Sequence, residues 1–268
     1  MRVSSLLIAA AVAVGLIATP VAASTVAAAP SGQQRALQQL DGLAVKGRAP
    51  RTGYDRALFG QAWSDDVDVA GGHNGCDTRN DILGRYLVNK TYKAGTRNCV
   101  VLTGTLNDPY TGKQIEFVRG ANSSKVQIDH VVALSDAWQK GAQSWSSDKR
   151  RDFANDPANL LAVDGTANQQ KGAGDAATWL PANKAYRCTY VAKQVSVKAD
   201  YGLWVTAAEK DAIRRILNNC DGDAPQQNRQ TQPTRPQNQP ESVYYRNCSQ
   251  ARAAGAAPLY RGQPGYRS

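Results

Sequence analysis

The sequence predicts an α+β domain, mostly helical, with a few short antiparallel strands and disulfide bonds. Residues 206–220 begin with T-x-x-E and continue with apolar residues at helical spacing, the pattern of a capped amphipathic helix. The stretch VQIDHVVAL, residues 126–134, contains the alternation that is typical of a half-buried strand. Five cysteines follow an N-terminal export signal, and exported cysteines usually form disulfides.

The expected elements follow in chain order. Asp77 is placed to cap a helix over DTRNDILGRYLV, which has an apolar face. CVVLTGTL and IEFV are expected to be strands on either side of the turn-rich NDPYTGKQ, and KVQIDHVV and NLLAVD are expected to be two more. SDAWQKGA and SSDKRRDFA are expected to form short helices. The T-x-x-Q pattern in TANQQK predicts a helix that starts at Thr166.

Residues 1–23 have the layout of a secretory signal peptide. Arg2 precedes an apolar run, residues 6–18, and a small-residue cleavage site follows at residues 21–23. The alternative is a transmembrane anchor, but the apolar run is short for one. We therefore expect cleavage and an extracellular protein with no stable membrane insertion. Residues 24–50 are expected to be a flexible leader, in which QQRALQQLDGL can form a helical turn.

Composition divides the rest of the chain into three parts. Residues 51–220 have the texture of a globular domain, whereas residues 221–241 are almost entirely Gln, Pro, Asn, Arg and acid, which predicts an extended linker. Residues 242–268 predict a small terminal module. The chain has 32 Lys and Arg against 22 Asp and Glu, an excess that favours polyanionic partners such as nucleic acid, a wall polymer or an anionic membrane surface.

The cysteine spacing argues for disulfides and against zinc. No CxxC spacing occurs, and the chain has only two histidines. Four cysteines of the globular part allow three pairings, of which sequence proximity favours Cys76–Cys99 with Cys188–Cys220. Cys248 is then the odd thiol.

Asp129 and His130 are neighbours in a predicted strand. Successive strand residues face opposite sides, so Asp129 is not placed to orient the imidazole as in a catalytic triad, although its oxygens suit a hard cation. A histidine with an ordinary pKa near ~6.5 can accept a proton from water at neutral pH. The pair therefore predicts a carboxylate that holds a metal and an imidazole that activates water.

Residues 155–172 offer partners for such a site. Asn159 begins a second strand that can pair antiparallel with the first, where its amide can fix the imidazole tautomer, and Asn155 is the alternative. Asn168, near the first turn of the next helix, can give the metal a second oxygen. Lys171, one turn later, suits a phosphate or an acidic neighbour. The arrangement predicts phosphodiester cleavage with one metal ion.

The blocks DHVVAL, NLLAV and NQQKG resemble the ββα-metal motif of HNH nucleases, in the variant whose last ligand is Asn. That variant occurs in RNA-guided nucleases and in the C-terminal domain of GmrSD-type restriction enzymes. From about Tyr54 to Cys220 the chain, with GCDTRNDIL, LNDPYTGKQIEF, GAQSW and WLP, resembles the secreted actinobacterial HNH endonuclease family. An HNH ββα-metal core embedded in the disulfide-bonded domain is therefore expected.

The resemblance implies a role for each matching residue. His130 matches the general base and Asn159 the residue that orients it. Asp129 and Asn168 match the ligands of one ion, Mg²⁺ or Mn²⁺, that stabilises the leaving 3′ oxygen. DNA is the expected substrate, with RNA as an alternative, and a monomer is expected.

Several residues have a structural explanation beside the functional one. Arg79 and Lys171 are weak candidates for substrate binding, and an ion pair explains Arg79 equally well. His73 lies in a glycine-rich loop and is expected to be solvated. The basic run at residues 149–151 is most simply a solvated helix face, with contact to the DNA backbone as the alternative.

The end of the chain, YYRNCSQARAAGAAPLYRGQPGYRS, resembles the start of an excalibur domain, a small extracellular calcium-binding module. The aspartate-rich loop of that family does not occur before Ser268, so calcium binding is not expected, although association with the cell wall is. A second class of function also remains open. The chain can be a non-catalytic secreted protein that binds wall polymer or another polyanion.

Overall fold

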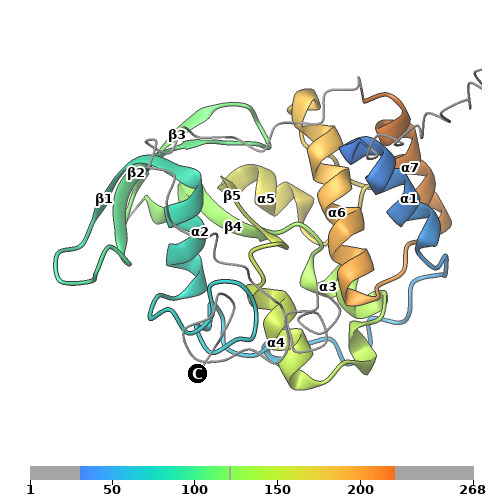
Figure 1. Ribbon diagram of the computed structural model, residues 1–268, viewed down its shortest axis with the longest axis horizontal. Helices are drawn as coiled ribbons and strands as arrows, with labels where there is room; N and C mark the ends of the chain where they lie inside the picture. The colour runs from blue at the N-terminus through green and yellow to red at the C-terminus, as the bar shows by residue number, and fades with distance from the viewer. Residues whose placement is uncertain (1–30, 121, 221–268) are drawn as a thin grey trace, which may run out of the picture.

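The computed structural model describes residues 31–120 and 122–220 as helices around two small antiparallel sheets (Figure 1). The helices are α1 (Gly32–Gly42), α2 (Thr78–Tyr86), α3 (Leu134–Gln139), α4 (Ser147–Asn155), α5 (Gly165–Lys171), α6 (Arg187–Tyr201) and α7 (Ala207–Asn218). The strands are β1 (Leu87–Tyr92), β2 (Val101–Asn107), β3 (Gln114–Val118), β4 (Val126–His130) and β5 (Leu160–Asp164). The predicted α+β class with short antiparallel strands is confirmed.

The two sheets lie on one side of the helical cluster formed by α1, α6 and α7. β1, β2 and β3 form an antiparallel meander, and β4 pairs antiparallel with β5. Figure 1 shows the three-stranded sheet at one end, the β4–β5 hairpin with α5 in the middle, and α1, α6 and α7 at the other end. The predicted active-site residues therefore lie at the centre of the fold.

Local sequence signals placed some helix ends correctly and others wrongly. The T-x-x-E capping box at Thr206 is confirmed, because its side chain accepts from the Glu209 amide and Glu209 reaches back to the amide of Thr206. The helix that begins after Asp77 ends at Tyr86, two residues earlier than predicted, because the chain continues as β1.

The predicted start of α5 at Thr166 is wrong. The N-cap is Asp164, whose carboxylate accepts from the Ala167 amide at 2.7 Å. Gly165 lets this end of the helix approach the chain before β4, since a Cβ there would lie 2.2 Å from the Ser124 carbonyl oxygen. The approach explains why the helix begins at a glycine.

The flexible leader predicted for residues 24–50 is wrong from Ser31 onward, whereas the helical turn expected at QQRALQQLDGL is confirmed. Residues 32–42 form α1, whose N-cap is Ser31, and the buried Ala36 and Leu40 pack against α6 and α7. Val45 then forms a β-bridge with Val205. The domain therefore begins well before residue 51.

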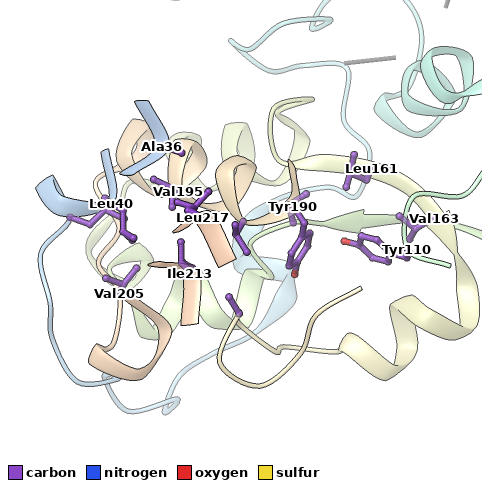
Figure 2. Packing of buried hydrophobic residues seen from close by; sticks show 14 of the residues in the cluster. Ala36, Leu40, Tyr110, Leu161, Val163, Tyr190, Val195, Val205, Ile213 and Leu217 are labelled. Carbon is purple, nitrogen blue, oxygen red and sulfur yellow. The ribbon is translucent and has the colours of Figure 1, made fainter. Parts of the chain in front are cut away.

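Buried apolar residues form three clusters. The largest joins α1, α6 and α7 to the β4–β5 hairpin, and Figure 2 shows Tyr110 and Tyr190 side by side within it. Their rings meet edge to face, with centroids 5.7 Å apart. A second cluster lies under α3 and α4, and a third lies between α2, the three-stranded sheet and one face of the hairpin. The hairpin is thus buried on both faces.

Six charged side chains form an ion cluster between the helices. Its members are Arg48, Lys140, Lys198, Asp136, Asp175 and Glu209. The Lys140 ammonium lies within 2.6–2.8 Å of all three carboxylates, and Lys140 and Lys198 have no exposed side-chain surface. Such a cluster is stable only when every charge is matched, and here three positive charges match three negative ones.

Both predicted disulfides, Cys76–Cys99 and Cys188–Cys220, are confirmed. The signal peptide, the linker and the terminal module with Cys248 lie outside the described residues. None of the described helices has the length and apolar character needed to cross a membrane.

Candidate active site

The β4–β5 hairpin presents Asp129 and His130 to opposite sides, as strand alternation predicts. Asp129 lies opposite Leu161 and His130 opposite Leu160. Leu161 belongs to the cluster of α1, α6 and α7, whereas Leu160 belongs to the cluster beneath α2. Both site residues are buried, with exposed fractions of 5% and 6%. The two neighbours therefore have separate environments.

The His130 ring is held by a main-chain carbonyl and an indole. Its Nε2 lies 2.8 Å from the carbonyl oxygen of Ala154, near the end of α4. Because a carbonyl only accepts, Nε2 carries the hydrogen and Nδ1 of the neutral ring keeps its lone pair. The Trp63 indole is stacked on the ring, with centroids 5.9 Å apart and planes at 12°.

The surroundings of His130 also keep the ring uncharged. Burial lowers the pKa of His130 to about 3, the hydrogen bond with Ala154 opposes this shift, and the positive charges of Arg56 and Lys171 add to it. The ring is therefore neutral at physiological pH and can accept a proton at Nδ1.

A cavity of about 220 Å³ adjoins His130. Its other walls come from the 3-10 helix η1 (Arg56–Phe59) and the chain after it, from the start of α3 and from the end of α4. Asn155, which is 1% exposed, lines the cavity and donates from Nδ2 to the carbonyl oxygen of Arg151. Its Oδ1 is buried and has no hydrogen-bond partner among the described residues. An unsatisfied acceptor thus lies beside the cavity that His130 faces.

Asn159 acts on the main chain after β4 and not on the imidazole. Its Oδ1 accepts from the Val132 amide at 2.8 Å, and its Nδ2 donates to the Val132 carbonyl at 3.2 Å. The amide contact with the imidazole that was predicted for Asn159, or for Asn155, is not formed. The Ala154 carbonyl makes that contact instead.

Asp129 is engaged through both carboxylate oxygens. The Tyr110 hydroxyl donates to Oδ2, and the Lys171 ammonium lies 2.9 Å from Oδ1. The same ammonium donates to the His130 carbonyl at 2.8 Å. Burial raises the pKa of Asp129 and is opposed by Lys171 and Tyr110, while burial and the neighbouring Asp129 raise the pKa of Tyr110 well above its usual value. Tyr110 therefore remains a donor to the carboxylate.

The two predicted metal ligands do not form a metal site in this arrangement. The Asn168 amide donates to Gln127 Oε1 at 2.9 Å, and neither oxygen of Asp129 is free. The Lys171 ammonium already supplies a positive charge to Asp129. In the described part of the chain, no group of three or more His, Cys, Asp or Glu side chains could hold a metal ion. These residues do not fit the predicted ion as they are placed here.

The weaker candidates for substrate binding make structural contacts. Arg79 is half-buried and donates to the Val126 carbonyl at 3.3 Å. Of the basic run, Lys149 donates to the Tyr201 carbonyl and Arg150 donates to the Leu58 and Trp145 carbonyls. The prediction that this run is simply a solvated face is therefore incomplete, because it helps to hold the domain together. His73 is exposed, as predicted.

Two protein families match parts of this chain. The family described as "GmrSD restriction endonucleases, C-terminal domain" matches residues 77–216, and the match supports an HNH-type nuclease function. Nuclease domains of this type generally use divalent metals. The Excalibur calcium-binding domain family matches residues 245–268.

A relative matches most of this chain. An "uncharacterized secreted protein" of Arthroderma benhamiae is 37% identical over 210 residues, which cover 78% of this chain and 95% of the relative. No solved structure matches.

Three parts of the site escaped prediction from the sequence. Ala154 acts through its main chain, which has no sequence signature. Trp63 lies in none of the sequence blocks quoted above. Tyr110 was part of a block of the family resemblance, LNDPYTGKQIEF, and this block was the only signal for it.

Proposed function

Since the chain belongs to the family of the GmrSD restriction endonuclease C-terminal domain, we propose that it is an exported HNH endonuclease that hydrolyses phosphodiester bonds of DNA. RNA is the second substrate to be tested. Residues 1–23 have the layout of an export signal, and the relative from Arthroderma benhamiae is described as secreted. The protein then acts outside the cell, as a monomer. Residues 245–268 match the Excalibur calcium-binding domain family, and in this proposal they attach the protein to the cell wall.

The observation that carries the proposal is the state of the His130 ring. The ring is neutral, its Nε2 is fixed by Ala154, its Nδ1 keeps a lone pair, and the residue lines a cavity. A water molecule in that cavity can donate one hydrogen to Nδ1 and the other to Asn155 Oδ1. His130 removes a proton as the water oxygen forms its bond to phosphorus, and the bond from phosphorus to the 3′ oxygen breaks.

In a nuclease of this type a bound divalent ion would supply positive charge to the leaving oxygen. The family resemblance names Mg²⁺ or Mn²⁺ as that ion. Asp129 and Asn168 are engaged with other residues, so the assay must determine whether an ion is required. Asn159 acts indirectly in this proposal, because it holds the main chain that directly follows His130.

The test is cleavage of supercoiled, linear and single-stranded DNA and of RNA by the protein from residue 24 onward. Each substrate is incubated with Mg²⁺, Mn²⁺, Ca²⁺ or Zn²⁺, and with a chelator. We expect nicking that falls by about 10²–10⁴-fold in His130→Gln, the range for loss of a general base. The chelator shows whether the nicking requires a divalent ion. The matched control is His73→Gln, which changes the other, exposed histidine.

Circular dichroism must show that both variants are folded. Undiminished cleavage by folded His130→Gln would refute the assignment of the base. Retention on DNA or cell wall without cleavage in any ion would instead support the non-catalytic polyanion-binding protein.

A further inference from the structure

The segment at residues 56–63 lies outside the matched family region, residues 77–216, and yet forms a wall of the cavity beside His130. We propose that this segment is a working part of the site, in which the Arg56 guanidinium binds a phosphate of the nucleic-acid strand and the Trp63 indole holds the His130 ring. The proposal rests on the nuclease function proposed above and names two further residues for it.

The segment is anchored on both sides of the site. The Trp63 carbonyl accepts from the Thr78 amide at 3.2 Å, at the start of α2. The Leu58 carbonyl accepts from the Arg150 guanidinium on α4 at 2.9 Å. The Phe59 ring packs in the cluster under α3 and α4. The segment is thus bound to α2 and to α4, the helix that also supplies the Ala154 carbonyl.

Arg56 has the properties of a phosphate-binding residue. Among the described residues that line the cavity it is the only charged one, so no lining carboxylate would repel an anion. Its side chain is exposed and has no hydrogen-bond or ion-pair partner in residues 31–120 and 122–220. A guanidinium can donate two parallel hydrogen bonds to a phosphate, and this one is not neutralised by a neighbour. The basic groups first considered, such as Arg79 and Lys171, are by contrast occupied.

Trp63 has the properties of a positioning residue. It is half-buried and its indole covers one face of the His130 ring at 12° between planes. Its φ of 60° lies in the left-handed region, which is an outlier for a bulky side chain and occurs most often at functional sites. The strained backbone of Trp63 is explained if its indole has to hold the His130 ring in one orientation.

The test for Arg56 compares Arg56→Gln with Arg51→Gln. Arg51 is the matched control because it is an exposed arginine five positions away that does not line the cavity and stacks on Tyr54. We expect Arg56→Gln to lower kcat/KM by about 10- to 100-fold, the effect of losing a hydrogen bond to a charged group. Arg56→Lys should recover part of this loss, because it keeps the charge without the paired donors.

A binding measurement separates this inference from the nuclease proposal. DNA affinity is measured against salt concentration in the His130→Gln background, where cleavage does not interfere. Loss of one phosphate contact should reduce the slope of log affinity against log salt by about one. A reduced slope with an inactive wild type would refute the nuclease function and keep the phosphate site. Cleavage by the wild type with equal slopes and equal kcat/KM for Arg56→Gln and Arg51→Gln would overturn the phosphate site alone.

The test for Trp63 separates kcat from KM. Trp63→Leu should lower kcat about 10-fold and leave KM unchanged, and Trp63→Phe should restore most of kcat, since misplacement of a catalytic group slows the chemical step. Unchanged kcat in Trp63→Leu, or a change in KM alone, would overturn the positioning role. A Trp63→Phe variant that is folded but no more active than Trp63→Leu would do the same.

Discussion

Replacing Lys171 with methionine should destabilise the domain strongly, and more at neutral than at mildly acidic pH. Methionine keeps an unbranched chain but has no charge. It would leave Asp129 Oδ1 and the His130 carbonyl without the donor that now lies 2.9 Å and 2.8 Å away, where the Lys171 side chain has no exposed surface. Breaking a buried ion pair costs about 3–5 kcal/mol, a large part of the about 5–15 kcal/mol that stabilises a typical domain.

The dependence on pH follows from Asp129. Burial already raises the pKa of this carboxyl in the folded protein, and removal of Lys171 takes away the main opposing charge. The folded variant would then bind a proton that the unfolded chain, with an ordinary pKa near ~3.9, does not bind. The destabilisation should therefore shrink as the pH falls from neutral to about 5.

Urea unfolding at both pH values, with equal m-values, measures the effect. The double variant Asp129→Asn with Lys171→Met removes both charges and should be more stable at neutral pH than Lys171→Met alone. A loss below about 1 kcal/mol for Lys171→Met, or an equal loss at both pH values, would refute a buried ion pair between these residues.

Three further predictions concern the hairpin and the ion cluster. Burial lowers the pKa of His130 to about 3 in the folded protein, so below pH ~6.5 the unfolded chain binds a proton that the folded chain does not. The free energy of unfolding of the wild type should therefore fall by about 1.4 kcal/mol per pH unit, relative to His130→Gln, between pH ~6.5 and about 4. Urea titrations check this, and equal slopes for the wild type and His130→Gln would contradict it. Asn159→Ala should cost about 2–4 kcal/mol and speed hydrogen exchange at the Val132 amide, since the main-chain N–H and C=O of Val132 both lose a buried partner. Unchanged exchange would contradict this role. Lys140→Met should lower the free energy of unfolding in urea by about 3–5 kcal/mol, because three buried carboxylates lose a shared cation. A stability equal to that of the wild type would show that Lys140 and these carboxylates are not paired as ions.

The sequence predicted those elements whose signals are local. The capping box at Thr206 involves residues three apart, and the strand around Asp129 is bounded by its own alternation, so both were found. α1 was expected only as a helical turn within the leader, because its apolar residues, among them Leu40, are few and become buried only through contact with α6 and α7. The start of α5 was misplaced because Asp164 and Thr166 can both cap a helix. The close approach of Gly165 to the Ser124 carbonyl, in the chain before β4, lies outside local sequence.

The site divides in the same way between local and distant causes. Alternation alone predicted that Asp129 and His130 face opposite sides, and the hairpin bears this out. The partners of Asp129 are 19 residues before it and 42 residues after it, so local spacing could not identify Tyr110 and Lys171 as the pair that occupies both oxygens. A carboxylate beside a histidine suggests a bound metal cation, but the cation that pairs with Asp129 here is the Lys171 ammonium.

The buried charges determine how the protein should respond to ionic strength. Three buried lysines, Lys140, Lys171 and Lys198, and the more exposed Arg48 are matched by four buried carboxylates, so together they contribute no net charge. These carboxylates belong to Asp129, Asp136, Asp175 and Glu209. The formal charge of +10 therefore belongs to the remaining residues. Salt screens exposed charges far more than buried pairs. A concentrated salt solution should accordingly release a bound polyanion while the folded domain keeps its internal ion pairs.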